Sequence, residues 1–314
     1  MSTANEMNEW PCIVIAGPTA TGKTALAVEV AHALGSEIFS IDSRQVYRGL
    51  DLGTGKDFDE YRRFDPPVPY HLIDIVNPDE IYSLFRFQAD CYAALEDFRK
   101  RKGNDVPPIL VGGTGLYLEA VLKRYDIAQV PENLELREAL GQRELDDLKQ
   151  ELKSRDPALY GKTDVSNKRR VVRALEVALS GPSENLPRTR LPDWTLQPLL
   201  FIMQWDRTVL RERIAKRLQA RLKAGLVNEV RHLREQGISW ERLDDLGMEY
   251  REVSTFLRNE KTIELMTLDL THSIHQLAKR QDTWFRGLER RGLKTQFIGP
   301  EVTVADILER WNQV

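Results

Sequence analysis

Residues 17–24 read Gly-Pro-Thr-Ala-Thr-Gly-Lys-Thr and fit the pattern G-x-x-x-x-G-K-[ST] in full. An apolar stretch at 12–16 precedes the motif, and a helical pattern over about 23–34 follows it, which is the context that the motif requires. In such a loop, backbone N–H groups and the helix N-terminus bind a phosphate or diphosphate. Lys23 adds a cation, and the Thr24 hydroxyl can coordinate Mg²⁺. The alternative is a glycine-rich turn without a ligand. The predicted phosphate site consists of Gly17, Pro18, Thr19, Ala20, Thr21, Gly22, Lys23 and Thr24.

Asp42 is the second residue whose position suggests chemistry. It follows an apolar stretch at 37–41, which we expect to form a strand immediately beside the strand that leads into the phosphate loop. There its carboxylate could accept a proton from a hydroxyl or an amine. The competing interpretation is an aspartate that caps a helix or closes a turn. The apolar stretch 108–111 ends in glycine, where an NTPase would place an aspartate for Mg²⁺. The pattern therefore favours an acceptor molecule over water.

Strand patterns that alternate with helical ones must position these residues. Such alternation predicts a parallel sheet with right-handed crossovers, whose working residues lie beyond the carboxyl ends of the strands. Three polar clusters, 17–24, 42–45 and 112–115, stand at those ends. We predict an α/β fold, a P-loop NTPase-like parallel sheet core flanked by helices with a helical insertion domain. The expected strands are 12–16, 37–41, 70–75, 108–111 and 198–203.

Strand patterns disappear between residues 124 and 196, where charged helical stretches end in a proline-rich linker at 181–192. We therefore predict a core of 1–123 and 197–314 and a helical insertion domain of 124–196. After the insertion, apolar residues at four-residue intervals predict one long helix. Its apolar face carries Leu210, Ile214, Leu218, Leu222 and Leu226, and another face carries Arg213, Arg217 and Arg221. A last helix is expected to bury Ile274, Leu277, Trp284 and Leu288.

Composition excludes several classes of protein. The 314 residues are 41% hydrophobic and 30% charged, which is unlike a disordered or fibrous chain. Two cysteines are too few for a disulfide framework or a zinc finger and suggest a reducing compartment. The sequence has no run of 18 apolar residues and no signal-peptide pattern, so we expect a soluble cytoplasmic protein.

The net charge of −3 hides a basic region. Residues 207–234 hold nine Lys or Arg against two Glu, and residues 273–294 hold six against two acids. Such a distribution suits a polyanionic partner, although charge alone favours solvated helix faces over that interpretation.

The motifs together resemble the tRNA dimethylallyltransferase (tRNA isopentenyltransferase) family, bacterial type. Gly17–Thr24 followed by Asp42-Ser-Arg-Gln-Val-Tyr-Arg-Gly49 opens the series. The later matching blocks occur in the family's order over about residues 11–290. They are 53–54, 71–74, 82–83, 111–117, 169–177, 225–230, 276–281 and 283–286.

The resemblance implies transfer of a dimethylallyl group from its diphosphate to N6 of the adenosine next to the anticodon, position 37, in tRNAs that read codons beginning with U. It implies Mg²⁺ as cofactor, a tRNA anticodon stem-loop as partner, no membrane and a monomer. Asp42 would take the proton from the amine, Thr114 would hold that amine or its neighbour, and Arg217 would assist the diphosphate, with Arg213 in reserve. The implied tRNA-binding residues are Asp42, Ser43, Arg44, Gln45, Thr114, Arg169, Arg170, Val171, Val172 and Arg173.

Some positions depart from the family pattern. Two residues separate Gly247 from Tyr250 where the family has Gly-Tyr, which puts tRNA contacts there in doubt. Residues 53–57 read Gly-Thr-Gly-Lys-Asp, and Pro182 follows Gly181 where lysine is usual. Three alternatives remain open. They are an enzyme that prenylates free adenine nucleotides, a P-loop small-molecule kinase that binds ATP in the loop, and a non-catalytic RNA-binding protein.

Overall fold

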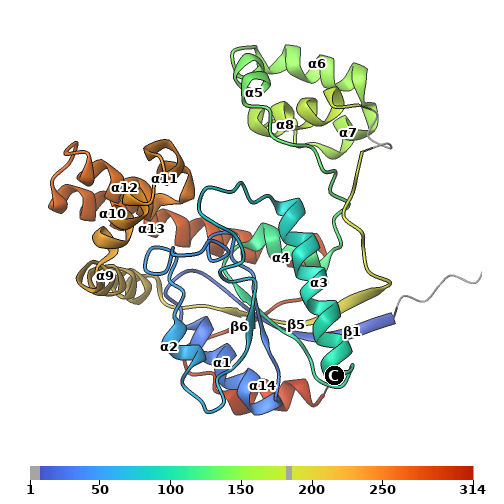
Figure 1. Cartoon of the computed structure of the whole chain (residues 1–314). Coiled ribbons are helices and arrows are strands. Elements are labelled where there is room, and N and C mark those ends of the chain that lie inside the picture. Colours follow the sequence, from blue (N-terminus) through green and yellow to red (C-terminus); the bar gives the residue numbers. More distant parts are fainter. Residues whose placement is uncertain (1–7, 182–185, 314) are drawn as a thin grey trace, which may run out of the picture. The chain divides into compact units, whose positions relative to one another are not determined.

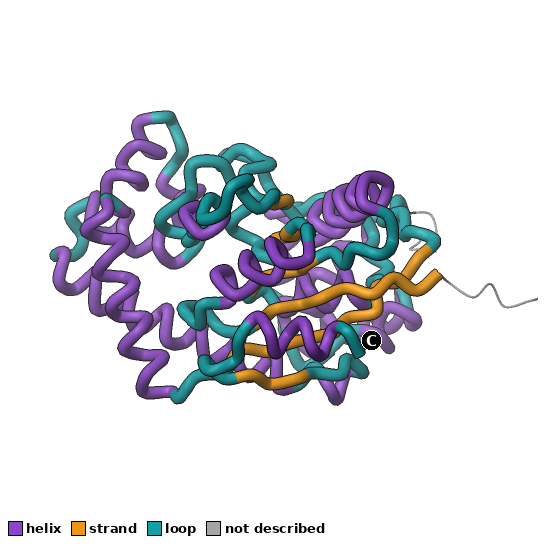
Figure 2. Tube along the Cα trace, turned by 90° about the horizontal axis from the view of Figure 1, so that it is seen from below, coloured by secondary structure: helices purple, strands orange, loops and turns teal. Residues whose placement is uncertain are grey.

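The computed structural model describes residues 8–181 and 186–313 and separates them into two compact units. The first unit runs to Arg124 and resumes at Pro192, and it holds a six-stranded sheet in the order β3-β2-β4-β1-β5-β6 (Figures 1 and 2). Every neighbouring pair of strands is parallel. The strands are β1 (Asn8–Ala16), β2 (Ile38–Ser40), β3 (Tyr70–His71), β4 (Ile109–Gly112), β5 (Trp194–Met203) and β6 (Gln296–Ile298).

Alternate residues of the strands face opposite layers of helices, because side chains in a strand alternate between the two faces of the sheet. Ile13 and Ile109 share one buried cluster with Ala27 of α1 (Lys23–Leu34) and Ile307 of α14 (Val304–Trp311). The ring of Trp10 packs on the other face. It stacks on the ring of Phe98 in α3 (Leu84–Lys102), with 6.0 Å between the ring centroids. The ring of Phe39 contacts the Phe98 ring edge-on. The core therefore lies on both faces of the sheet (Figure 1).

The first unit also contains helices that precede, connect or follow the strands. The prediction of one long helix that includes Leu226 is wrong. Gly225, in a left-handed conformation with φ 108°, terminates α9, so that Leu226 begins a separate helix. These elements are α2 (Phe58–Tyr61), α4 (Gly115–Leu122), α9 (Arg207–Ala224), α10 (Leu226–Glu235), α11 (Trp240–Leu246), α12 (Met248–Leu257), α13 (Ile263–Arg286) and the 3₁₀ turn η2 (Glu289–Arg291).

The sheet departs from the prediction in three ways. The strand carrying Asp42 does not adjoin β1, because β4 pairs with both β2 and β1 and lies between them. The strand expected over 70–75 ends at His71, since Leu72 and Asp74 adopt positive φ values of 65° and 56° that no strand accommodates. The edge strand β6 was not predicted, because it has only three residues.

The second compact unit, 125–191, is helical. The first unit resumes at Pro192 rather than at residue 197, and its strand β5 pairs with β1 from Trp194 onward. Of the expected proline-rich linker, residues 182–185 lie outside the described part of the chain. The helices of this unit are α5 (Leu134–Gly141), α6 (Leu145–Arg155), α7 (Pro157–Lys162) and α8 (Lys168–Leu179), and they enclose a small core of Leu140, Leu148, Leu152, Val171, Val172, Ala174 and Leu175.

Candidate active site

The loop between β1 and α1 folds back on itself. Gly22, at φ 92°, stands at the N-cap of α1, a backbone conformation that favours glycine. The Thr21 hydroxyl donates to the carbonyl of Pro18 at 2.9 Å, and the Lys23 ammonium donates to the same carbonyl at 3.1 Å. The motif residues thus form a compact turn at the N-terminus of α1, where N–H groups without a partner in the helix attract an anion.

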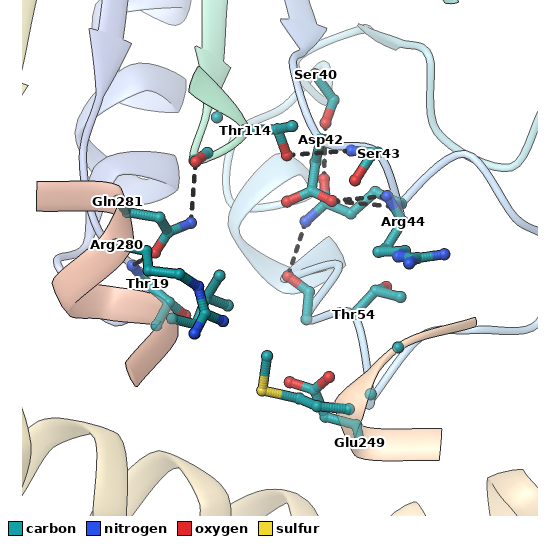
Figure 3. A pocket seen from close by; sticks show the side chains of 18 of the residues that line it. Thr19, Ser40, Asp42, Ser43, Arg44, Thr54, Thr114, Glu249, Arg280 and Gln281 are labelled. Carbon is teal, nitrogen blue, oxygen red and sulfur yellow. Dashed lines mark hydrogen bonds between the residues drawn. The ribbon is translucent and has the colours of Figure 1, made fainter. Parts of the chain in front are cut away.

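A cavity of about 780 Å³ opens beyond the carboxyl ends of the strands (Figure 3). The three polar clusters expected there, 17–24, 42–45 and 112–115, all contribute to its wall. Helices from the C-terminal half of the chain complete it, with Arg217 and Arg221 on α9, Glu249 on α12, and Arg280, Gln281 and Trp284 on α13. Leu277 and Trp284 also face this cavity, whereas the sequence pattern placed both in a buried helix face.

Asp42 closes a turn and also faces the cavity, so its position is compatible with both the structural and the catalytic interpretation. Its Oδ1 accepts hydrogen bonds from the backbone N–H of Arg44 at 2.8 Å and of Gln45 at 3.4 Å, as in an aspartate turn. Both bonds end on the same oxygen, and the carboxylate lines the cavity (Figure 3). The Thr114 hydroxyl accepts from the N–H of Ser43 at 3.3 Å, so β4 and β2 hold these two side chains at one place. The turn orients Asp42 while Oδ2 remains for a ligand.

The phosphate loop carries a strongly basic neighbourhood. The Lys23 side chain is half-buried where it lines the cavity, and this burial, with the nearby Arg217 guanidinium, lowers its pKa from 10.5 to about 8. The carboxylates of Asp42 and Asp57 partly oppose that shift. Lys23 therefore stays charged near neutral pH only at an electrostatic cost, which an incoming anion would relieve.

Two arginines of α9 reach the phosphate loop. Arg217 donates to the hydroxyl of Thr19 at 3.3 Å and forms an ion pair with Asp57 at 2.8 Å. Arg213 donates through Nε to the carbonyl of Ala20 at 2.8 Å and lines a second cavity of about 380 Å³ that shares Lys23 and Thr24 with the first. Both arginines thus lie where the sequence analysis expected an anion.

Gln281 was missed as a site residue, although it belongs to a block that matches the family. Its Oε1 accepts from the N–H of Thr19 at 2.9 Å, and its Nε2 donates to the carbonyl of Gly113 at 2.9 Å (Figure 3). One side chain of α13 therefore ties the phosphate loop to the end of β4.

Glu229 on α10 was also missed. Its carboxylate accepts three backbone N–H groups, those of residues 51–53, at 2.6 to 3.1 Å. The Tyr250 hydroxyl donates to the same carboxylate at 2.8 Å, and its ring fills the space where a Cβ on Gly53 would stand. Glu229 belongs to the block 225–230 that matches the family, but that block does not indicate its partners, which are far away along the chain. One carboxylate thereby anchors three consecutive residues of the loop that lines one side of the cavity.

In the helical unit, the five expected tRNA-binding residues of α8 differ in burial. Arg169 and Arg170 are exposed, and Arg170 pairs with Asp164 at 2.7 Å. Arg173 is bound to Glu176 and to a backbone carbonyl. Val171 and Val172 are buried in the core of this unit, at 0% and 8% exposure, so their side chains stabilise that core, and a contact with tRNA stays a prediction. The spacing of the helix turns them inward when the arginines face solvent.

The side chains near the phosphate loop suit a Mg²⁺ ion that is held mainly by phosphate oxygens of a bound substrate. Thr24 lines the cavity with Lys23, and the described residues contain no group of three or more His, Cys, Asp or Glu able to hold a metal. Mg²⁺ commonly takes one or two protein ligands and completes its shell with phosphate oxygens and water. A hydroxyl at the start of α1 suits that arrangement.

Within residues 8–181 and 186–313, no helix is long and apolar enough to cross a membrane.

The sheet is parallel, and the G-x-x-x-x-G-K-T loop follows its inner strand β1 and lines a polar cavity. This combination defines a P-loop NTPase-like protein. The family model for IPP transferase matches residues 45–288, and that for isopentenyl transferase matches 11–63. The chain belongs to the IPP transferase family.

Individual relatives agree with that assignment. A tRNA dimethylallyltransferase 1 of Syntrophus aciditrophicus is 48% identical over 286 residues, covering 91% of this chain and 92% of the relative. The crystal structure of a tRNA isopentenylpyrophosphate transferase from Bacillus halodurans is similar at a TM-score of 0.68 and 29% identity, over 98% of this chain and 96% of that one. A eukaryotic dimethylallyltransferase acting on tRNA shares the fold, with a TM-score of 0.73 at 24% identity over 96% of this chain and 76% of the other.

Proposed function

We propose that this protein transfers a dimethylallyl group from dimethylallyl diphosphate to N6 of the adenosine next to the anticodon, position 37, in tRNAs that read codons beginning with U. The observation that carries the proposal is one cavity that joins a diphosphate-binding loop to a carboxylate. Lys23 and Thr24 lie on its wall together with Asp42 and Thr114. Relatives named tRNA dimethylallyltransferase at 48% and 46% identity support the choice of donor and acceptor.

The phosphate end of the cavity assists the leaving group. In the reaction the bond between C1 of the dimethylallyl group and the diphosphate oxygen breaks, and the diphosphate leaves with the electron pair. Lys23, the loop amides and Arg217 neutralise the charge that grows on this oxygen. Mg²⁺, held by the diphosphate and Thr24, would supply further neutralisation when bound.

The other end of the cavity serves the acceptor. As N6 of the adenosine forms its bond to C1, it becomes positively charged and must lose one proton. Oδ2 of Asp42 accepts that proton, while the turn to Arg44 and Gln45 holds Oδ1 and fixes the carboxylate. The hydroxyl of Thr114, held by the N–H of Ser43, is placed to bond the amine or a neighbouring base atom.

An adenosine stacked in an anticodon loop cannot reach this cavity, so the base must be flipped out of its stack. Residues 42–45 would then meet the flipped base and its neighbours. We assign Arg169, Arg170 and Arg173 of the helical unit to the phosphates of the anticodon stem-loop, because the first two are exposed cations. We expect a monomer that acts in the cytoplasm, and the free buried thiols of Cys12 and Cys91 are compatible with a reducing compartment.

The test is transfer of label from dimethylallyl diphosphate in the presence of Mg²⁺, with unmodified tRNA and AMP offered in separate reactions. The proposal predicts label in tRNA and none in AMP. Label in AMP alone would assign the protein to the enzymes that prenylate free adenine nucleotides. Turnover of ATP without a prenyl donor, and no transfer to either acceptor, would instead support a kinase.

A further inference from the structure

Arg221 carries a cation to which the proposed reaction assigns no role. It lies on α9 one turn after Arg217 and lines the same cavity as Lys23. Its Nη2 is shielded from solvent and has no hydrogen-bond partner among the described residues, and its Nη1 reaches only the carbonyl of Gly53 at 3.5 Å. A buried donor without a partner is costly, so its presence on a cavity wall indicates a missing ligand.

The two arginines stand beside each other against Gly55. A Cβ on this glycine, which has φ +69°, would come within 1.6 Å of Nη2 of Arg221 and 2.7 Å of Nη2 of Arg217. Burial and the neighbouring Arg217 lower the pKa of Arg221 to about 10. Two guanidinium groups are thus packed side by side, with Nη2 of Arg221 shielded from solvent, which favours an anion bound by both.

The nearby carboxylates do not neutralise Arg221. Asp57 is engaged by Arg217. Glu249 faces the same cavity, and burial raises its pKa, but it forms no ion pair with Arg221 in the described part of the chain. The unsatisfied cation therefore remains available to a ligand that enters the cavity.

We propose that Arg221 is a second diphosphate-binding arginine, which together with Arg217 forms a two-arginine clamp on the leaving group. This inference rests on the proposed function, since it assigns Arg221 to the same donor. A diphosphate is favoured over a backbone phosphate of RNA because Arg217 also touches Thr19 of the phosphate loop. The anion held between the two guanidinium groups would therefore be continuous with the anion held by that loop. As the C1–O bond breaks, the clamp binds the growing charge and the repulsion between the two cations is relieved.

The experiment measures affinity for inorganic pyrophosphate with Mg²⁺ by calorimetry, and affinity for tRNA separately, in full-length variants. Arg221→Met removes the charge and keeps the length of the side chain. Arg221→Lys keeps the charge and loses the planar fork. Lys223→Met is the matched control, because Lys223 is an exposed cation on the same helix and lines neither cavity.

We expect Arg221→Met to weaken pyrophosphate binding by about 10- to 100-fold, the loss typical of a charge-assisted hydrogen bond. The Lys variant should lose less, and the control variant should bind as the wild type does. Affinity for tRNA should change by less than about threefold in all three, because the proposal places the Arg221 guanidinium on the diphosphate and not on an RNA phosphate.

Unchanged pyrophosphate affinity in Arg221→Met would overturn the inference, as would a loss confined to tRNA, which would assign Arg221 to the RNA backbone. If the Met variant does not fold, the Lys variant decides by the same criterion. The pyrophosphate readout needs no acceptor. A wild type that binds pyrophosphate but never modifies tRNA would therefore refute the proposed function alone, and a wild type that modifies tRNA beside an unimpaired Met variant would refute only the role of Arg221.

Discussion

Replacing Lys23 with methionine should make the ligand-free protein more stable while it destroys diphosphate binding. The pKa of Lys23 falls from 10.5 to about 8 in the folded state, mainly by burial and also by Arg217. That difference corresponds to about 3 kcal/mol of destabilisation whenever the folded protein must keep Lys23 protonated. Methionine is similar in length but uncharged. It also loses the hydrogen bond to the Pro18 carbonyl, worth about 1 kcal/mol, so the net gain at pH 7 should be about 2 kcal/mol.

The stability difference between Lys23→Met and the wild type should decrease as the pH rises. Below pH 8 both the folded and the unfolded wild type hold the proton, so the full destabilisation is present. Between pH 8 and pH 10.5 the folded protein releases the proton while the unfolded chain keeps it, and wild-type stability therefore rises relative to the variant. The assay is urea unfolding of both proteins at pH 7.5, 8.5 and 10 in phosphate-free buffer. The advantage of Lys23→Met should shrink by about 2 kcal/mol across this range.

A difference between variant and wild type that stays constant from pH 7.5 to pH 10 would refute the reasoning, because Lys23 would then have an ordinary pKa in the folded state. A variant that is less stable at every pH would show that the hydrogen bond to Pro18 outweighs the burial of charge. Pyrophosphate affinity, measured on the same samples, should be lost in the variant and should fall in the wild type as pH rises above 8.

Three further perturbations test other parts of the account. Asp42→Asn should lower the single-turnover rate of transfer by about 10²- to 10⁴-fold with tRNA affinity within a few fold, and an equal loss of affinity and rate would contradict its role as base. Charge reversal of Arg169 and Arg170 together should weaken tRNA binding and reduce the salt dependence of its affinity by about two in the logarithmic slope, measured by filter binding; an unchanged slope would remove both from the interface. Glu229→Gln should lower the free energy of unfolding by about 2 kcal/mol in urea, because one amide oxygen replaces a carboxylate that accepts four hydrogen bonds; an unaltered midpoint would refute the importance of that contact.

Local patterns predicted the parts of the site that lie within one stretch of chain. The phosphate loop is such a case, because strand, glycine, lysine and helix are contiguous, and the α1 boundaries at Lys23 and Leu34 follow from the same stretch. The four-residue spacing on α9 likewise brought Arg213 and Arg217 to one helix face. Arg221 continues that spacing, but only the position of Gly55 shows that its guanidinium is buried beside Arg217.

Features that depend on long-range pairing could not be read from the sequence. The position of β4 between β2 and β1 depends on which strands meet across more than 60 residues, and hydrophobic patterns do not specify strand order. The contact of Glu229 with the loop at 51–53 has the same origin. The burial of Val171 and Val172 was not visible for a different reason, since a family motif names consecutive residues, whereas a helix turns neighbouring side chains to different sides.

The central claim is tested most directly by identifying the product in tRNA. Purified protein, dimethylallyl diphosphate and Mg²⁺ are incubated with unmodified tRNA, and with the same tRNA in which the adenosine next to the anticodon is replaced by guanosine. The tRNAs are then digested and analysed by mass spectrometry. The account predicts N6-dimethylallyladenosine from the first tRNA only. No modified nucleoside in either tRNA, or one that persists in the substituted tRNA, would contradict it.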